Sequence, residues 1–159
     1  MKPAFTARRT CRSAVMHNEV RLHIYRCMGE TGRAPDVRET AAALDRSIDE
    51  VEAAYRQLHA DHVMVLKPES LDIWMAMPFS NVPTPFRVIA GEREYFANCA
   101  WDAFGIPAAL ESDARILTRC GDSGEAMEIE IAGGNLRAAS GIAHFALPAA
   151  RWWADIGYT

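Results

Sequence analysis

The chain has 159 residues, of which 50% are hydrophobic and 24% charged, and its formal net charge is −4. This is the composition of a globular protein, and the length suffices for one fair hydrophobic core or two small ones. No apolar run approaches the roughly 18–20 residues that a membrane-spanning helix needs. The negative net charge gives no general attraction to nucleic acid. We therefore expect no membrane partner and no nucleic-acid partner.

Residues 1–17 are basic and lack the continuous apolar stretch of a secretory signal. We expect them to form a flexible basic arm of a cytoplasmic protein. Cysteines stand at positions 11, 27, 99 and 120, and their spacings match no CxxC or Cys/His zinc pattern. The spacings therefore predict no structural zinc site. Because the cytoplasm keeps thiols reduced, no disulfide framework is predicted either.

The first half of the chain predicts three helices in succession. Apolar residues recur every four positions from Val20 to Met28, which is the spacing of one face of an amphipathic helix. A second, short helix is expected over the segment VRETAAALD. Ser47 and Glu50 have the spacing of a capping box, which opens the third helix.

A β-hairpin is expected next, from the segments HVMVLK and LDIWMAM on either side of Pro68. Three helices followed by a two-stranded wing form the layout of a winged helix-turn-helix, so we assign residues 18–79 to a winged-helix-like domain. A DNA reader places its third helix in the major groove, with basic or amide side chains near the N-terminal end. Here that end reads SIDEVEAAYRQL. Its carboxylates would be repelled by phosphates, which favours a structural or dimerising role over DNA binding.

Residues 80–85 contain two prolines and are expected to link this domain to a second one, residues 86–159. The spacing predicts a helix from about Glu92 to Ala103, ended by Gly105 and Pro107. Strands are expected in four segments of the second domain: FRVIA, ARILTRC, EAMEIEI and GIAHFALP. The predicted fold class is α+β, with the winged helix-turn-helix followed by a small mixed β-sheet domain.

The helix predicted over EYFANCAWDAF carries Cys99 and Asp102 three positions apart, so both side chains project from one face. A thiolate is a soft nucleophile and soft-metal ligand, while a carboxyl group can take or deliver a proton. Two adjacent anions are unfavourable in a dry site, so one proton shared by the pair is the expected resting state. From spacing alone, a buried structural cysteine with Asp102 exposed or capping is the favoured alternative.

The stretch YFANCAWDAFGIPAALESDARILTRCGDSGEAMEIEI resembles the core of the alkylmercury (organomercurial) lyase family. That family carries Cys-x-x-Asp on a helix, then an apolar Pro-Ala-Leu turn and a strand ending in a further cysteine. The resemblance implies that Cys99 is the first reactive cysteine, Asp102 the proton-handling aspartate and Cys120 a non-catalytic strand cysteine. It extends from about Asn18 to Thr159 and includes the upstream winged helix.

The activity implied by this resemblance is protonolysis of carbon–mercury bonds. Soft sulfur ligands hold the mercury, and an acid protonates the leaving carbon. The implied partners are an organomercurial small molecule and the mercury ion product, with Cys99 as a transient mercury ligand. External thiols would accept the mercury, and no organic cofactor or activating metal is expected.

Alignment to the family places its second reactive cysteine immediately after Thr159. We therefore expect the chain as given to be C-terminally truncated, with weak or lost activity. A hypothesis is that the next codon is a stop triplet that encodes selenocysteine. The alternative function is a winged-helix transcriptional regulator or a soft-metal-binding module without catalysis.

Overall fold

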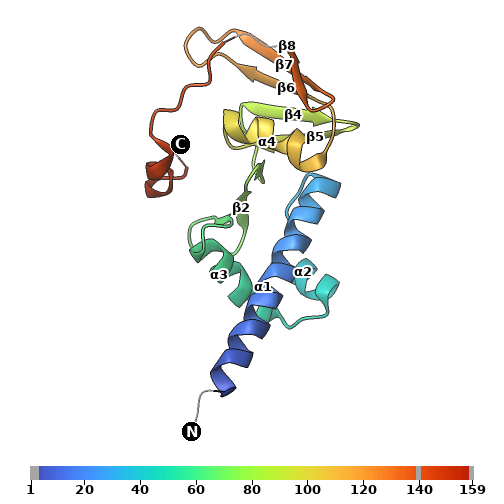
Figure 1. Ribbon diagram of the computed structural model, residues 1–159, viewed down its shortest axis with the longest axis vertical. Helices are drawn as coiled ribbons and strands as arrows, with labels where there is room; N and C mark the ends of the chain where they lie inside the picture. The colour runs from blue at the N-terminus through green and yellow to red at the C-terminus, as the bar shows by residue number, and fades with distance from the viewer. Residues whose placement is uncertain (1–3, 139–140, 158–159) are drawn as a thin grey trace. The chain divides into compact units, whose positions relative to one another are not determined.

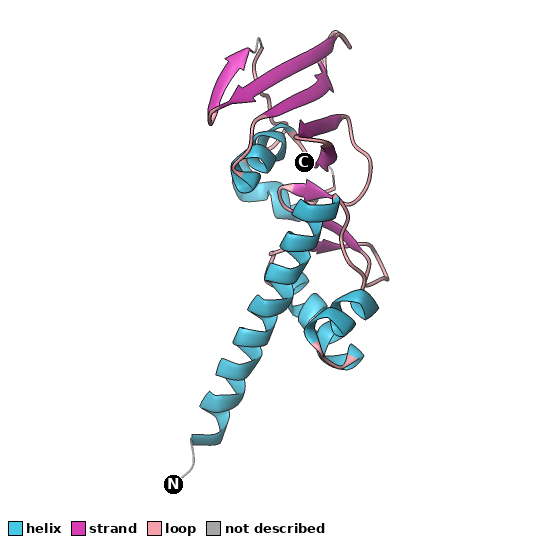
Figure 2. Cartoon of the chain, turned by 90° about the vertical axis from the view of Figure 1, so that its right-hand side faces the viewer, coloured by secondary structure: helices cyan, strands magenta, loops and turns pink. Residues whose placement is uncertain are grey.

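The computed structural model describes residues 4–138 and 141–157. The chain divides into two compact units, Met1–Pro83 and Thr84–Thr159, with the boundary inside the proline-containing segment 80–85. Each unit combines helices with antiparallel strands (Figures 1 and 2), so the predicted α+β fold class is confirmed.

The first unit contains three helices and a three-stranded antiparallel sheet. Its elements are α1 (Ala4–Thr31), α2 (Val37–Leu44), α3 (Ile48–Ala60), β1 (Val65–Leu66), β2 (Ile73–Ala76) and β3 (Phe79–Ser80). Strand β2 pairs with both β1 and β3, which confirms the predicted hairpin and adds a third strand that the sequence did not predict.

Helix α1 begins at Ala4, so residues 4–17, expected as a flexible arm, are helical. The physical reason lies in the segment AFTARRTCRSAV, which contains no Gly or Pro and is rich in Ala and Arg, two strong helix formers. The predicted buried stripe on this helix is confirmed, since Val20, Ile24 and Met28 are each at most 1% exposed.

The second unit contains a five-stranded sheet in the order β5-β4-β6-β7-β8 and one α-helix. Its elements are β4 (Phe86–Ala90), β5 (Arg93–Ala97), α4 (Ala100–Leu110), β6 (Ala114–Arg119), β7 (Ala126–Ala132), β8 (Asn135–Ala138) and the 3₁₀ helix η1 (Ala149–Ala154). Every neighbouring pair in this sheet is antiparallel, so the expected mixed sheet is wrong. The reason is that α4 carries the chain from one side of β4 to the other, while hairpins make the remaining connections.

Helix α4 packs on β4, β5 and β6 and covers the core of the second unit. That core is built from Val88 of β4, Tyr95 and Ala97 of β5, Ile106 of α4 and Ile116 of β6, all at most 4% exposed. Because α4 follows β5 after only two residues, its first turn is fixed against the end of the sheet.

The helix predicted from Glu92 to Ala103 is wrong in its first half, which forms β5. Gly91, with a φ of +59°, makes a tight turn that folds this segment back onto β4 in an antiparallel hairpin. Gly105 and Pro107 do not end the helix either. They lie inside α4, which continues to Leu110. Pro107 is buried, and because it has no N–H group, α4 lacks one internal hydrogen bond at this position.

The strand predicted over GIAHFALP is wrong as well. Residues 141–148 form no strand, and Ile142 is 95% exposed. Pro148 instead starts η1, and Trp152 Nε1 donates a hydrogen bond to the Leu147 carbonyl at 2.9 Å. The extra strand of this unit is β8, which follows β7 through the adjacent glycines Gly133 and Gly134, both with positive φ.

Candidate active site

Cys99 and Asp102 lie at the N-terminal end of α4, directly after β5. Cys99 has extended backbone angles and occupies the N-cap position, so Ala100 is the first helical residue and Asp102 the third. The N-cap and third positions of a helix face one another, which is why capping boxes use this spacing. The predicted proximity of the two side chains therefore arises at a strand-to-helix junction and not within a continuous helix.

Three polar side chains lie together at the junction of β5 and α4: Asn98, Cys99 and Asp102. The Cys99 thiol and the Asp102 carboxyl group lie close enough for each to shift the pKa of the other. Asn98 Nδ2 donates to Asp102 Oδ2 at 2.9 Å. Asp102 is buried, at 8% exposed, whereas Cys99 is half-buried. The acid is thus held among fixed partners while the sulfur is partly open to solvent.

Burial raises the pKa of the Cys99 thiol, and the nearby Asp102 charge adds to this rise. The backbone N–H groups of Trp101 and Asp102 act in the opposite direction, because they favour a thiolate at the start of a helix. Burial also raises the pKa of Asp102, against the hydrogen bonds from Asn98 and Cys99. Both groups resist ionisation, which favours one proton shared between sulfur and carboxylate.

Cys120, which the resemblance gives as a non-catalytic strand cysteine, lies in the turn between β6 and β7. It follows β6, its N–H group donates to the Glu125 carbonyl at 2.8 Å, and its carbonyl accepts from the Gly124 N–H group at 2.9 Å. A hydrogen bond from Ser123 is the main cause that lowers the pKa of its thiol. These contacts are those of a turn-stabilising residue.

Three residues near the pair were not identified as site residues from the sequence. Asn98 bonds the acid, and Trp101 and Phe104 project from α4 with 68% and 37% of their surfaces exposed. The signal for Asn98 was its position four residues before Asp102. For the aromatic residues, the signal was large apolar side chains on the solvent face of a short helix.

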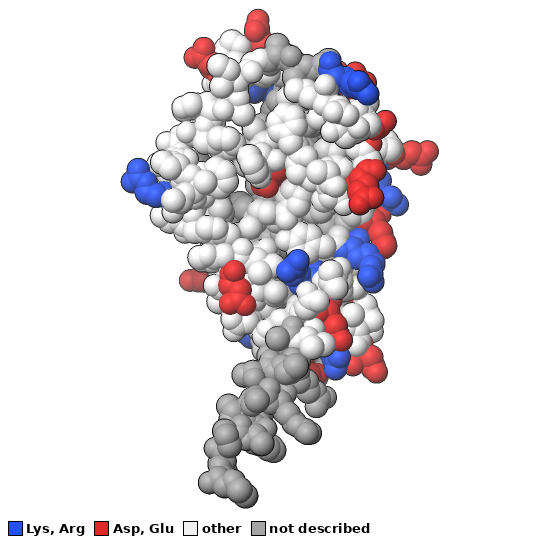
Figure 3. Space-filling model, viewed as in Figure 1, with Lys and Arg blue, Asp and Glu red and all other residues white. Residues whose placement is uncertain are grey.

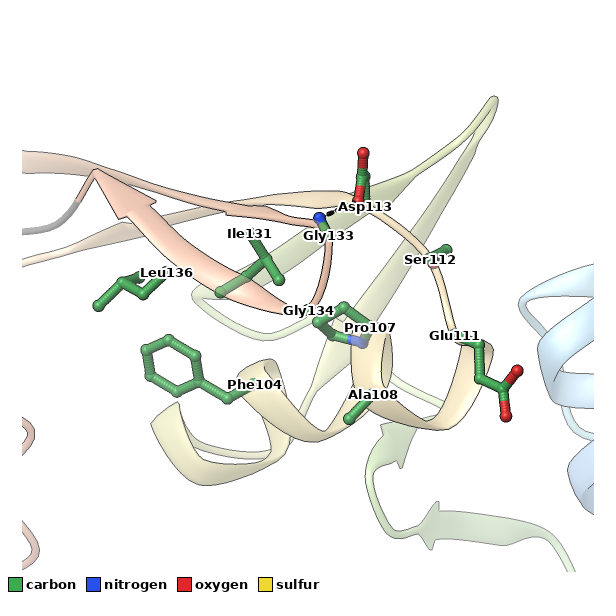
Figure 4. A pocket seen from close by; sticks show the side chains of 10 residues that line it. All are labelled: Phe104, Pro107, Ala108, Glu111, Ser112, Asp113, Ile131, Gly133, Gly134 and Leu136. Atoms are coloured by element: carbon green, nitrogen blue, oxygen red, sulfur yellow. Dashed lines mark hydrogen bonds between the residues drawn. The ribbon is translucent and has the colours of Figure 1, made fainter.

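An apolar groove of about 700 Å³ runs between α4 and the β7–β8 hairpin (Figure 4). Phe104, Ile131 and Leu136 face one another across it, and Asp113 Oδ1 accepts a hydrogen bond from the Gly133 N–H group at 2.7 Å. In the view of Figure 3, uncharged side chains fill most of the central area, and charged side chains lie mostly toward the edges. Neither Cys99 nor Asp102 lines the groove, so it is a separate feature of the second unit.

Two negative findings apply to the described parts of the chain. None of its helices is both long and apolar enough to cross a membrane. In the side-chain arrangement of residues 4–138 and 141–157, no three His, Cys, Asp or Glu side chains converge as a metal site.

The chain was compared with known proteins. The family model for alkylmercury lyase (MerB) matches residues 79–159, just over half of the chain. A solved structure described as the mercury-bound form of MerB2 matches with a TM-score of 0.63 and 23% sequence identity. The match covers 79% of this chain and 59% of that one, so the present chain spans about three fifths of its length. No curated protein matches. On the family match, the chain belongs to the alkylmercury lyase family.

Proposed function

We propose that the chain cleaves the carbon–mercury bond of organomercurials by protonolysis. The observation that carries this proposal is that Cys99 and Asp102 occupy the N-cap and third positions of α4, where each acts on the pKa of the other. The pair lies within the region that matches the alkylmercury lyase family. It combines a soft ligand for mercury with an acid that can protonate carbon.

The first step is capture of the organomercurial. The Asp102 carboxylate takes the thiol proton from Cys99, and the resulting thiolate displaces a thiol ligand from mercury. The backbone N–H groups at the start of α4 favour the thiolate as it forms. The half-buried sulfur can be reached by a small organometal, while the buried carboxyl keeps the proton out of bulk water.

The second step is proton transfer to carbon. A second sulfur from a thiol in solution adds to mercury and weakens the carbon–mercury bond by donating electron density. Asp102, now protonated, delivers its proton to the leaving carbon, which departs as the hydrocarbon. Mercury(II) stays on the two sulfurs, and further external thiols remove it. No organic cofactor takes part in this sequence.

Burial of Asp102 suits this role because a carboxyl group with a raised pKa holds its proton until a stronger base forms beside it. A carbanion-like carbon is such a base. Asn98 fixes one carboxylate oxygen and leaves the other for the thiol. The residues can therefore hold and move a single proton between sulfur and carbon.

We assign the first unit a structural role in this proposal. Asp49 and Glu50 occupy the first turn of α3 and are exposed, and these carboxylates oppose a phosphate backbone at the helix end that a DNA reader would insert. The layout of three helices and a wing supports a winged-helix assignment for residues 18–79.

The test is hydrocarbon release from methylmercury or phenylmercury in excess thiol, measured by gas chromatography of methane or benzene. The wild-type chain should release the hydrocarbon slowly, because a thiol in solution replaces the second protein sulfur. Cys99→Ser should not release it, because a hydroxyl oxygen is too hard to hold mercury. Cys120→Ser is the matched control, since it removes a thiol of the same unit and should retain release.

Equal rates for wild type and Cys99→Ser would refute the proposal. Tight mercury binding without hydrocarbon release by the wild-type chain would replace it with a soft-metal-binding module.

A further inference from the structure

The apolar groove between α4 and the β7–β8 hairpin has the size of a ligand site and lies apart from the Cys99 pair. Its volume of about 700 Å³ falls within the range of about 300–1,000 Å³ that small-molecule pockets occupy. It lies entirely within the second unit, and the proposed lyase chemistry does not use it. The residues that line it therefore indicate a ligand of its own.

One end of the groove is apolar. Phe104 projects from α4, and Ile131 and Leu136 project from the hairpin that faces it (Figure 4). Helix α4 packs on β4, β5 and β6, while β7 and β8 extend the sheet beyond these strands. Phe104 and Leu136 consequently remain 37% and 55% exposed. An aromatic or aliphatic body placed between these side chains would remove apolar surface from water, which favours binding.

The other end of the groove is acidic. Glu111 and Asp113 lie there, just after the C-terminus of α4 (Figure 4). The last turn of α4 contains no basic residue, so the carbonyl groups at the helix end add negative potential. Among the described residues that line the groove, none is Lys, Arg or His. Arg137 follows Leu136 in β8 and, by the alternation of a strand, projects from the opposite face. This end therefore attracts a cation.

Two side chains at the acidic end offer acceptor oxygens to a bound cation. Asp113 Oδ1 accepts a hydrogen bond from the Gly133 N–H group at 2.7 Å, which orients the carboxylate and leaves its second oxygen for another donor. Ser112 also lines the groove. Within the described part of the chain, its buried hydroxyl oxygen has no hydrogen-bond partner. Such an atom is costly to leave unpaired, and the N–H groups of an ammonium ion can supply the partner.

We propose that this groove binds a small organic cation. The apolar body of the ligand lies between Phe104 and Leu136, and its ammonium group lies at the end formed by Glu111 and Asp113. The complementarity is both apolar and electrostatic, so an uncharged or anionic molecule of the same shape should bind less tightly. The site is independent of the Cys99 pair, and its ligand need not contain mercury.

The test compares three probes that share one apolar body and differ in charge: naphthylmethylammonium, neutral naphthylmethanol and anionic naphthylacetate. Each is titrated into the full chain while nitrogen–proton correlation NMR spectra are recorded. The cation should shift the amide signals of Gly133, Gly134 and Leu136 in a saturable way. It should bind at least about threefold more tightly than the neutral probe, and the anion should bind least tightly. Added salt should reduce the advantage of the cation.

Two variants separate the charged and the apolar contributions. The double variant Glu111→Gln, Asp113→Asn should bring the affinity for the cation down to that for the neutral probe, while the asparagine keeps an acceptor for Gly133. Leu136→Ser should weaken binding of all three probes by about threefold or more, because it removes one apolar wall. The dispersion of the amide signals shows that each variant is folded.

Matched controls lie away from the groove. Glu125→Gln neutralises an exposed acid at the opposite end of β7, and Leu22→Ser removes a leucine of similar exposure (49%) from α1. Both should bind the cation as wild type does. The proposal is overturned if the neutral probe binds as tightly as the cation, if the double variant keeps wild-type affinity, or if the shifts map outside the groove. Dimer formation that competes with the cation would also overturn it, because a second copy would then occupy the groove.

Discussion

Two helix N-termini in this molecule carry a pair of polar residues at the same spacing, but the two pairs have different roles. At α3, Ser47 accepts a hydrogen bond from the Glu50 N–H group, and Glu50 Oε2 accepts one from the Ser47 N–H group at 3.0 Å. At α4, Cys99 and Asp102 occupy the same two positions, but the sulfur makes no cap of this kind. The first pair is exposed and the second is largely removed from water.

The difference between the two caps indicates that the N-terminus of α4 is less stable than that of α3. Ser is among the best N-cap residues, whereas a thiol is a weak acceptor. A buried carboxyl group also costs free energy unless it is hydrogen-bonded, and here Asn98 Nδ2 donates such a bond to Asp102. Positions that break local rules in an otherwise consistent fold are the expected places for function. The following changes test that contrast.

The largest effect is expected from Asp102→Asn. Loss of the proton donor should lower hydrocarbon release by about 10²–10⁴-fold, the usual contribution of a positioned acid or base. The melting temperature at pH 7 should stay equal or rise, because an amide removes a buried ionisable group while keeping an oxygen for Asn98. If Asp102→Asn lost activity only because it unfolded, Asp102 would serve stability and not proton transfer.

Asn98→Ala should have the next largest effect. A hydrogen bond to a charged group contributes about 1.5–3 kcal/mol, so removing this one should slow hydrocarbon release by roughly ten- to a hundredfold. Steady-state rates at saturating phenylmercury give the measurement. Rescue by Asn98→Gln is not expected, since the longer side chain moves its amide. Unchanged rates in the alanine variant would show that Asp102 is positioned without Asn98.

The two helix caps should respond differently to substitution. Ser47→Ala should lower the free energy of unfolding by about 0.5–2 kcal/mol. Cys99→Ser should lower it by less or raise it, because the hydroxyl oxygen is a better cap for α4 than the thiol. Urea unfolding followed by circular dichroism compares them. A larger loss for Cys99→Ser would mean that the sulfur is there for stability.

The smallest effect concerns acid stability of the first unit. A hydrogen bond from the exposed Arg33 guanidinium, supported by the Asp36 N–H group, lowers the pKa of Glu39 from 4.5 to about 2. A lowered carboxyl pKa stabilises the fold above pH 4.5, and this contribution disappears as the pH falls toward 2. Glu39→Gln should therefore melt with a shallower pH dependence than wild type in this window. Parallel profiles for the two proteins would contradict the assignment.

Much of the fold was predictable because local signals agreed with the tertiary structure. The apolar stripe of α1 and the capping box of α3 were visible in the spacing of a few residues, and the packing confirms them. The sequence predicts a helix around Tyr95, because the apolar residues there fit a helical period as well as that of a strand. This segment forms a strand because the turn at Gly91 brings it beside β4, with which it pairs. The periodicity of the sequence indicates neither the turn nor the partner strand.

The candidate site was predictable in its residues but not in its geometry. The spacing of Cys99 and Asp102 placed them together under either a helix or a cap. The N-cap position of the sulfur, the burial of the acid and the hydrogen bond from Asn98 depend on how β5 leads into α4. Side-chain burial at such a junction is set by long-range packing, which a single sequence does not specify.

The central claim is that one sulfur holds mercury and one acid protonates carbon. Intact-mass spectrometry after mixing the protein with one equivalent of phenylmercury and one equivalent of thiol, too little to strip mercury from the protein, separates the two roles. Wild type should carry mercury without the phenyl group. Asp102→Asn should carry the whole phenylmercury adduct on Cys99. An intact phenyl adduct on the wild type, or loss of the phenyl group from Asp102→Asn, would contradict the account.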